Sequence, residues 1–343
     1  MKAIFDPVQT QHDPQNFLVM GTKRSSPEQP ERVTRLRAGA EAAGCTFEAP
    51  GDAGLGPIAA IHTPEYVAFL QTIHARWQDL PGAAPEVIPN IHARARNDSY
   101  PTSPVGQAGY HQGDTACPIG AQTWGSAYAS AQTAISGADA VADGARAVYA
   151  LSRPPGHHAY ADMASGFCFL NNSAIAAERL RSKGLRPAIL DVDVHHGNGT
   201  QDIFYARNDV LTVSIHADPT GFYPFFWGHA SERGVGAGLG YNLNLALPMG
   251  SGDAAFLEAL GAAQTRIADF GADVLVVALG LDAHESDPFK AMAVTADGFE
   301  QIGAALARPG LPVLFVQEGG YLSDDLGPNL TRVLGGYQGA TPR

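Results

Sequence analysis

Short apolar runs alternate with longer amphipathic stretches along most of the chain. The apolar runs predict buried strands at 1–5, 147–152, 188–194, 210–216, 241–247, 274–282 and 311–321. The amphipathic stretches predict helices at 26–44, 63–80, 127–144, 171–184, 253–270 and 295–307. Alternation of this kind is typical of an α/β fold with a mostly parallel sheet and helices on both faces.

The predicted strand at 188–194 carries polar residues that a buried strand normally lacks. Asp191, Asp193 and His195 occupy every second position, with Val192 and Val194 between them. Because side chains alternate across a strand, the three polar groups share one face. Two carboxylates and an imidazole on a buried face are costly without a cation. This pattern therefore predicts a metal site at the carboxyl end of the strand, where open α/β sheets bind their ligands.

The segment 81–125 follows no helical or strand period and is rich in Pro, Gly, Asn and His. Loops of this length in a compact domain are usually functional or make oligomer contacts. Its aromatic residues, Tyr100, Tyr110 and Trp124, argue against a disordered insertion.

Composition narrows the class of protein. No linker divides residues 1–343, so we expect a single domain. The net charge of −12 argues against binding to nucleic acid or anionic membranes. Three scattered cysteines form neither a disulfide framework nor a metal knuckle, and no apolar run resembles a signal peptide or a membrane span, so we expect a cytoplasmic protein.

A third metal ligand is predicted at the end of another strand. Catalytic Zn²⁺ takes about three protein ligands from histidine nitrogens and carboxylate oxygens. Asp193 and His195 supply two, and Asp282, after the apolar run at 274–281, supplies the third. Asp282 alone is better interpreted as a cap for the following turn, but the three together favour a metal site.

Two adjacent histidines, His157 and His158, follow a predicted strand and a PPG turn. Near a metal they are candidates for a general base and a general acid, each needing a partner on its other ring nitrogen. Asp191 and Asn198 are the candidate partners. A charged partner raises the pKa of its histidine whereas a neutral amide barely does, so we expect unequal proton affinities.

Glycine and aromatic residues in two further motifs are candidates for the same site. Gly319 and Gly320 let the backbone approach a ligand closely, and the Tyr321 phenol is a suitable donor to an oxyanion. Gly166 and Phe167 precede the helix at 171–184, and Phe167 is either core packing or the wall of a channel for an alkyl chain. The chain has no lysine after its HHGNG loop and no GxSxG elbow, which disfavours phosphate-loop and serine-hydrolase chemistry.

These motifs, taken together, resemble the zinc-dependent histone deacetylase superfamily. They are RPPGHH at 153–158, GFCFLNN at 166–172, DVDVHHGNGTQDIFY at 191–205, SIH at 214–216, the strand ending in Asp282, and EGGY at 318–321. The length, the insertion at 81–125 and the Asn198 variant are most similar to the bacterial acetylpolyamine amidohydrolases within it. The resemblance implies an arginase/deacetylase fold, a three-layer α/β/α sandwich around an eight-stranded, mostly parallel sheet.

The resemblance also implies roles for particular residues. Asp193, His195 and Asp282 match the ligands of one zinc ion, with iron(II) as the alternative. His157 and His158 match the base and acid pair, Tyr321 the carbonyl-polarising phenol, and Asp191 and Asn198 the partners of the histidines. Two structural K⁺ sites are implied, the first at Asp191, Asp193, His195, Ser214 and Ile215, the second at Phe204, Arg207, Val210 and Tyr241. The substrate would contact Gly166, Phe167, Asp114, Gly319 and Gly320, and the insertion at 81–125 would narrow the active-site rim within a homodimer.

The sequence thus predicts a zinc amidohydrolase that deacetylates a small cationic N-acetylated alkylamine, such as an acetylpolyamine or an acetyl-lysine-type substrate. One alternative is a binuclear manganese ureohydrolase of the same fold, suggested by His284 in the stretch LDAHESD. Another is a catalytically silent regulatory protein that keeps the metal site.

Overall fold

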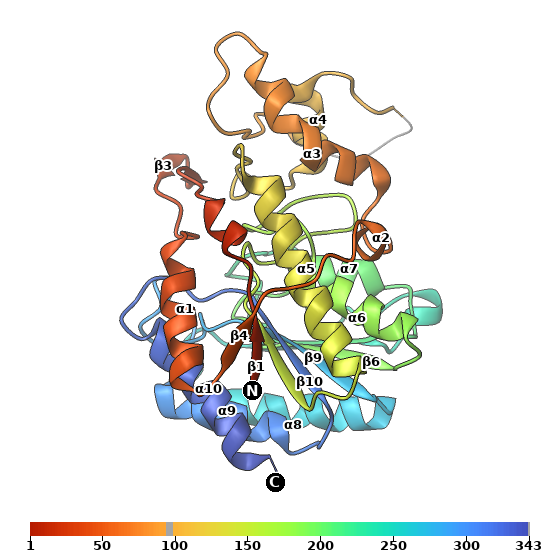
Figure 1. Ribbon diagram of the computed structural model, residues 1–343, viewed down its shortest axis with the longest axis vertical. Coiled ribbons are helices and arrows are strands. Elements are labelled where there is room, and N and C mark those ends of the chain that lie inside the picture. Colours follow the sequence, from red (N-terminus) through yellow and green to blue (C-terminus); the bar gives the residue numbers. More distant parts are fainter. Residues whose placement is uncertain (94–98, 342–343) are drawn as a thin grey trace.

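The computed structural model describes residues 1–93 and 99–341, and its centre is one eight-stranded sheet (Figure 1). The strand order is β4-β1-β5-β10-β9-β6-β7-β8, and every pairing is parallel. The strands are β1 (Lys2–Ile4), β4 (Thr46–Glu48), β5 (Ala147–Ala150), β6 (Pro187–Asp191), β7 (Leu211–Ala217), β8 (Asn242–Leu247), β9 (Val274–Leu279) and β10 (Val313–Gln317). The predicted fold class is confirmed.

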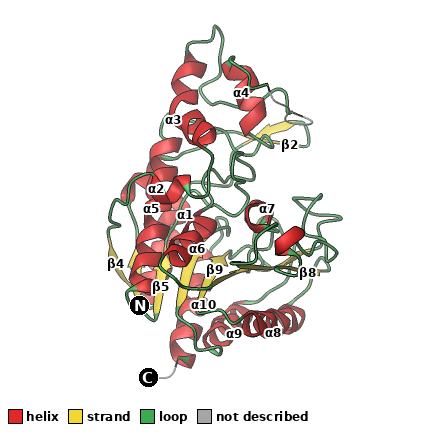
Figure 2. Ribbon diagram, turned by 90° about the vertical axis from the view of Figure 1, so that its right-hand side faces the viewer, coloured by secondary structure: helices red, strands yellow, loops and turns green. Residues whose placement is uncertain are grey.

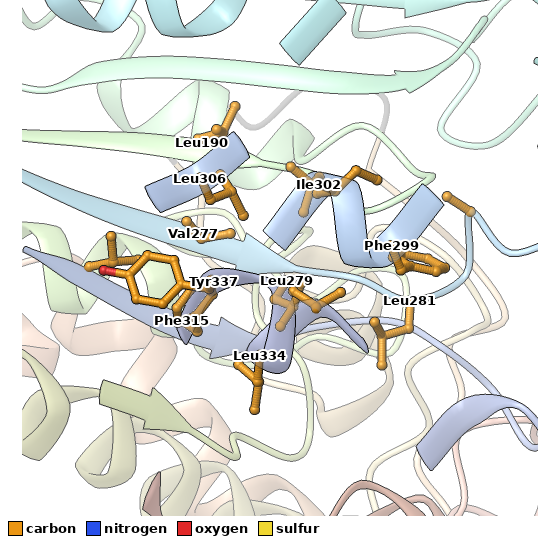
Figure 3. Close-up of a cluster of buried hydrophobic side chains, with 14 of the residues drawn as sticks. Leu190, Val277, Leu279, Leu281, Phe299, Ile302, Leu306, Phe315, Leu334 and Tyr337 are labelled. Atoms are coloured by element: carbon orange, nitrogen blue, oxygen red, sulfur yellow. The ribbon is translucent and has the colours of Figure 1, made fainter. Parts of the chain in front are cut away.

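Helices cover both faces of the sheet, as Figures 1 and 2 show. Helices α1 (Glu31–Ala42), α8 (Asp253–Phe270), α9 (Ala296–Ala307) and α10 (Leu326–Ala340) contribute side chains to the core on one face. Part of that core, including Val277, Phe315 and Tyr337, is drawn in Figure 3. The other core contains side chains of α3 (Pro64–Gln78), α5 (Thr123–Ala142) and α6 (Asn172–Ser182). Strands buried on both faces explain why their sequences are almost continuously apolar.

The capping and periodicity signals of the sequence predicted some helix boundaries correctly and others incorrectly. Thr63 caps α3 as predicted, with its hydroxyl accepting a hydrogen bond from the backbone N–H of Tyr66. The start predicted at residue 26 is wrong, because α1 begins at Glu31 and the Ser26 hydroxyl accepts instead from the N–H of Glu28. Helix α5 begins at Thr123, four residues before its predicted start at 127.

The segment 81–125 is more regular than its sequence suggests. It contains helix α4 (Pro104–His111), and an antiparallel bridge joins Val87 to Ile119. Residues 94–98 lie outside the described part of the chain. With α3, this segment forms the region at the top of Figure 1, beyond the end of the sheet. A small hairpin, β2 (Phe17–Val19) and β3 (Thr22–Arg24), lies there too (Figure 2).

Three central strands end earlier than their apolar runs. Strand β6 ends at Asp191, β9 at Leu279 and β10 at Gln317. Asp193, His195, Asp282 and Tyr321 therefore lie on the loops that follow these strands, whereas Asp191 is the last residue of β6. The alternation predicted beyond Asp191 still holds, because Val192 and Val194 enter the core. Two short helices, α2 (Gly56–Ala59) and α7 (Asn198–Phe204), complete the α-helices of the described residues. No helix within 1–93 or 99–341 combines the length and the apolar character needed to cross a membrane.

Candidate metal and catalytic site

Three buried side chains meet where the loops after β6 and β9 run side by side. Asp193 and Asp282 have no exposed surface and His195 is 6% exposed. His195 Nδ1 lies 3.1 Å from Asp193 Oδ1 and 3.2 Å from Asp282 Oδ2. Each residue offers one ligand atom, and these atoms lie within 4.8 Å of one another. The structure thus brings together the three residues predicted to bind the metal.

The surroundings of this triad suit a metal. The remaining carboxylate hydrogen bonds come from backbone N–H groups, with Gly319 donating to Asp193 Oδ2 (2.7 Å) and Val194 to Asp282 Oδ1 (3.0 Å). Burial opposes a charge on His195, yet its contacts with the two carboxylates raise its pKa to about 9. One imidazole nitrogen and two carboxylate oxygens form a donor set suited to zinc or iron(II). The residues present therefore fit a single divalent metal.

Two glycines allow the carboxylates to sit this close to the backbone. A Cβ on Gly280 would lie 2.2 Å from Asp193 Oδ2, and one on Gly319 would lie 2.2 Å from Asp282 Oδ2. Both contacts are too short for real atoms, so any side chain at either position would displace a predicted ligand. This gives Gly319 a structural reason to be glycine that does not depend on the substrate.

The adjacent histidines have different partners. His157 Nδ1 lies 2.9 Å from Asp191 Oδ2, and His158 Nδ1 lies 2.6 Å from Asn198 Oδ1. The Asn198 amide donates to the hydroxyl of Tyr160, which directs its oxygen toward His158. Nδ1 of His158 is therefore the protonated ring nitrogen, and Nε2 has a free lone pair.

The proton affinities of the two histidines differ in the predicted sense. Burial opposes a charge on His157, but the carboxylates of Asp191 and Asp193 raise its pKa to about 10. Burial and the neighbouring His157 and His195 lower the pKa of His158 well below its usual value. At neutral pH, His157 carries a charge and His158 does not.

Tyr321 lies in an aromatic wall beside this group. Its ring centroid is 4.9 Å from that of Phe289 and 5.8 Å from that of Phe167, and the Phe289 ring also lies 5.2 Å from His195. Burial raises the pKa of the Tyr321 phenol well above its ordinary value, so it stays protonated. Among the described residues, none forms a hydrogen bond with its hydroxyl, which leaves it free for a ligand.

The predicted substrate contacts surround the same space. Phe167 has a left-handed backbone (φ 69°) next to Gly166 (φ 52°), and its ring also contacts Phe17 at 5.4 Å. The Asp114 carboxylate accepts from the N–H of Gly166 (3.0 Å), so a residue of the 81–125 segment fixes this turn. Gly320, with φ 104°, belongs to the turn before Tyr321.

Several buried polar residues that support the site were not predicted. Glu318, which the sequence places in the EGGY motif without a role of its own, accepts hydrogen bonds from the N–H groups of Gly156 (2.6 Å) and His157 (3.0 Å). Arg32 donates to the carbonyl oxygens of Glu318 and Gly320, both at 2.6 Å. Asp287 accepts from the N–H of Tyr321 (3.0 Å). These bonds link the histidine loop, the tyrosine loop and helix α1.

An aromatic run in the loop after β7, FYPFFW at 222–227, was also overlooked. Phe222 stacks on His195 at 4.8 Å, and Tyr223 lies edge-on to His158 at 5.0 Å. A cluster of aromatic residues in a predicted loop is a signal that would have identified Phe222 and Tyr223, because aromatic side chains in loops usually pack against other residues.

Other predicted residues lie near the site or apart from it. Asp191 and Ser214 are register partners on β6 and β7, and both line a small cavity under the HHGNG loop. The backbone carbonyls of Phe204 and Tyr241 accept from the N–H groups of Arg207 and Thr212. The two K⁺ sites that include these residues stay predictions. The remaining predicted members of these sites are Ile215 and Val210, both fully buried.

A second group of candidate ligands, His157, Cys168 and Glu318, lies beneath the histidine loop. It fits a metal poorly. The Glu318 carboxylate already accepts three hydrogen bonds, including one from the Ser173 hydroxyl. Burial raises the pKa of the Cys168 thiol well above its ordinary value, and a protonated thiol is a weak ligand.

Comparisons with known proteins agree with this geometry. The family model described as a histone deacetylase domain matches residues 26–336. The chain is 47% identical over 338 residues to an acetylpolyamine amidohydrolase of Burkholderia pseudomallei, with 98% of both chains covered. It is 41% identical over 314 residues to the Mycoplana ramosa acetylpolyamine amidohydrolase, with 91% of this chain and 92% of that protein covered.

A solved structure is similar to this chain over its whole length. The crystal structure of an acetylpolyamine aminohydrolase from Burkholderia pseudomallei superimposes with a TM-score of 0.96 at 47% identity, covering 100% of both chains. Because the family model spans most of the chain and these relatives align over nearly their whole length, the chain belongs to the histone deacetylase family.

Proposed function

We propose that the protein is a metal-dependent amidohydrolase that removes the acetyl group from N-acetylated alkylamines, with acetylpolyamines as the preferred class. The observation that carries the proposal is the meeting of the Asp193–His195–Asp282 triad with an uncharged His158 in one buried site. The names of the full-length relatives support the acetylated polyamine as substrate.

Three side chains act at different steps of the proposed reaction. His158 Nε2 takes a proton from the attacking water and later gives it to the departing amine. The Tyr321 hydroxyl donates a hydrogen bond to the carbonyl oxygen as negative charge develops there. The charged His157, fixed by Asp191, stabilises that negative charge electrostatically and does not leave its ion pair.

Asp193, His195 and Asp282 would hold the metal, zinc or iron(II), which lowers the pKa of a water molecule and polarises the amide carbonyl when it is bound. The buried side chain of Phe167 and the half-buried side chains of Phe222 and Phe289 limit the access of bulk water to this chemistry.

The neutral partner of His158 predicts a pH effect. In the variant Asn198→Asp, a carboxylate would face His158 Nδ1 and raise the pKa of His158. The base is active only when unprotonated, so the acid limb of the kcat/KM profile should move to higher pH by about one to two units. Profiles of the wild type and the variant between pH 5 and 9 measure this, and Asn242→Asp, a matched change on β8, should leave the limb in place. An unmoved limb in Asn198→Asp would remove His158 from the role of base.

The substrate class is tested by a turnover panel. On metal-loaded enzyme, acetylputrescine and acetylspermidine should be hydrolysed with kcat/KM at least about tenfold above acetyl-lysine peptides. The segment 81–125, which we propose narrows the active-site rim, would admit a slender chain more readily than a peptide. A preference for bulky peptides would overturn both the substrate class and the narrow rim.

The binuclear ureohydrolase is less well supported. His284 takes no part in the triad: its Nδ1 lies 2.8 Å from the Ser286 hydroxyl, and its ring stacks on Phe299 at 5.9 Å. No second carboxylate-rich ligand group adjoins the triad within the described residues.

The remaining proposals concern the whole protein. We propose one deacetylase domain over residues 1–343, a homodimer interface at 81–125, structural K⁺ and a cytoplasmic location. The family model, which spans residues 26–336 without a break, supports the single domain.

A further inference from the structure

The peptide unit that joins Gly320 to Tyr321 is held at both of its polar ends by buried charged side chains. Its N–H group, from Tyr321, donates to Asp287 Oδ2 (3.0 Å). Its carbonyl oxygen, from Gly320, accepts from Arg32 Nε (2.6 Å). Asp287 is 3% exposed and Arg32 is 1% exposed, so bulk water does not compete for either bond. A carboxylate and a guanidinium therefore hold opposite edges of the same peptide plane.

This peptide unit needs support from outside its own loop because two glycines precede Tyr321. Glycine rotates more freely about its backbone bonds than other residues, and Gly320 has φ 104°, which other residues rarely adopt. The peptide bond is planar, so fixing both its N–H and its C=O fixes the rotation of the whole plane. The direction in which the Tyr321 side chain leaves the backbone follows from that rotation.

Asp287 also acts on Tyr321 by a second route, through Phe289. Asp287 Oδ1 accepts from the N–H of Phe289 (2.9 Å), in a turn where the aspartate side chain bonds the backbone two residues on. The Phe289 ring meets the Tyr321 ring at an angle of 75°, with the centroids 4.9 Å apart. The two oxygens of one carboxylate thus hold both the backbone of Tyr321 and an aromatic ring against which its side chain packs.

We propose that Asp287 is a positioning residue, which sets the location of the Tyr321 hydroxyl relative to the carbonyl group of the substrate. This inference rests on the proposed function, because it requires Tyr321 to be the donor to the oxyanion. Such a hydrogen bond depends steeply on geometry, and a displacement of about 1 Å can lower the rate about a hundredfold. Loss of the Asp287 carboxylate should therefore lower kcat without changing the metal content or the acid limb that His158 sets.

A double-mutant cycle tests the proposal on the metal-loaded enzyme, with acetylputrescine as the substrate. Asp287→Ala alone should lower kcat about thirtyfold and change KM less than about threefold. In the Tyr321→Phe background, which has no hydroxyl to misplace, the same change should lower kcat less than about threefold. Equal losses of kcat in both backgrounds would show that Asp287 acts independently of Tyr321 and would overturn the proposal.

Asp253→Ala is the matched control. The Asp253 carboxylate also accepts from the N–H of a residue distant in sequence, Thr295 (2.8 Å), but it lies at the start of α8. This variant should keep kcat within about twofold of the wild type, and a fall as large as that of Asp287→Ala would assign both effects to a general loss of stability. Asp287→Asn keeps the volume and one acceptor oxygen, and it serves if the alanine variant does not fold. Its loss of kcat, about fivefold, should also disappear in the Tyr321→Phe background.

Amide hydrogen exchange gives a readout that does not depend on turnover. Exchange of the Tyr321 N–H, followed by mass spectrometry in peptides that span 318–322, should be at least about tenfold faster in Asp287→Ala than in the wild type or Asp253→Ala. Unchanged exchange, or a metal content below that of the wild type, would overturn the proposal. If the wild type hydrolyses no acetylated amine while the difference in exchange persists, the proposed function is contradicted and the positioning of Tyr321 by Asp287 stands.

Discussion

Replacing Tyr321 by Phe should lower kcat for an acetylated amine by about a hundredfold or more, with little change in bound metal. The substitution removes only the hydroxyl. The remaining ring keeps its contacts with Phe289 and Phe167 and its place under the Arg32 guanidinium, which lies 5.0 Å from the ring centroid. The lost rate therefore measures the hydrogen bond to the developing oxyanion.

Three readouts separate this effect from a structural one. Metal content and thermal unfolding should match the wild type, while kcat falls. Tyr337→Phe is the matched control, because Tyr337 is also a buried tyrosine (2% exposed) but packs on Phe315 in the core, far from the chemistry. Wild-type kcat in Tyr321→Phe would exclude the proposed role of the phenol.

Replacing Asp282 by Asn should abolish tight metal binding and lower kcat/KM by about a thousandfold or more. The amide preserves the shape and can still accept from the N–H of Val194, but it removes one of the two carboxylates beside His195. Metal content per chain measures the first effect, and turnover with added metal measures the second. Asp273→Asn, at the opposite end of β9, is the control, because Asp273 is exposed and only accepts from the N–H of Arg186.

The thermal stability of the Asp282→Asn variant gives a second test of Asp282 as a metal ligand. With a chelator present, Asp282→Asn should be at least as stable as the wild type, because burial and Asp193 make the Asp282 charge costly and raise its pKa. Added metal should raise the melting temperature of the wild type by mass action and leave that of the variant unchanged. Equal stabilisation of both proteins by the metal would place the binding site elsewhere.

The site residues that the sequence identified share a local signal. Asp191, Asp193 and His195 interrupt an apolar run, and His157 follows one, so short-range pattern was enough to mark them. The sheet then explains why they meet. Because every strand pair of the eight-stranded sheet is parallel, the loops after β5, β6, β9 and β10 all emerge at one edge.

The supporting residues lacked such a signal because their contacts are distant in sequence. Arg32 reaches a carbonyl 288 positions away, and the Asp287 carboxylate accepts from the N–H of Tyr321 across 34 positions. On a helix, an arginine is usually interpreted as a solvated residue. Only the assembled fold reveals that Arg32 is 1% exposed and lies next to the tyrosine loop.

Helix α10 was missed for a different reason. The sequence pattern predicts no element after Tyr321, because glycines at 327, 335, 336 and 339 and Pro328 disfavour a helix. The structure explains two of these glycines by close helix packing. A Cβ on Gly336 would lie 2.1 Å from the Glu300 carbonyl oxygen of α9, and one on Gly327 would lie 2.7 Å from the Arg35 carbonyl oxygen of α1. Tertiary contact outweighs intrinsic propensity here.

The Asp114 carboxylate connects the segment 81–125 to the turn that carries Phe167, because it accepts from the N–H of Gly166 (3.0 Å). A change at Asp114 should therefore alter substrate choice more than the hydrolytic step.

The most direct test of the central claim is acetate release from acetylputrescine by enzyme that is metal-loaded, chelated and then reloaded with zinc. We expect acetate and free putrescine in equal amounts from the loaded enzyme, loss of both after chelation, and recovery with about one zinc per chain. Undiminished acetate release by the fully chelated enzyme, or activity that requires two manganese ions and yields urea from a guanidino compound, would contradict the account.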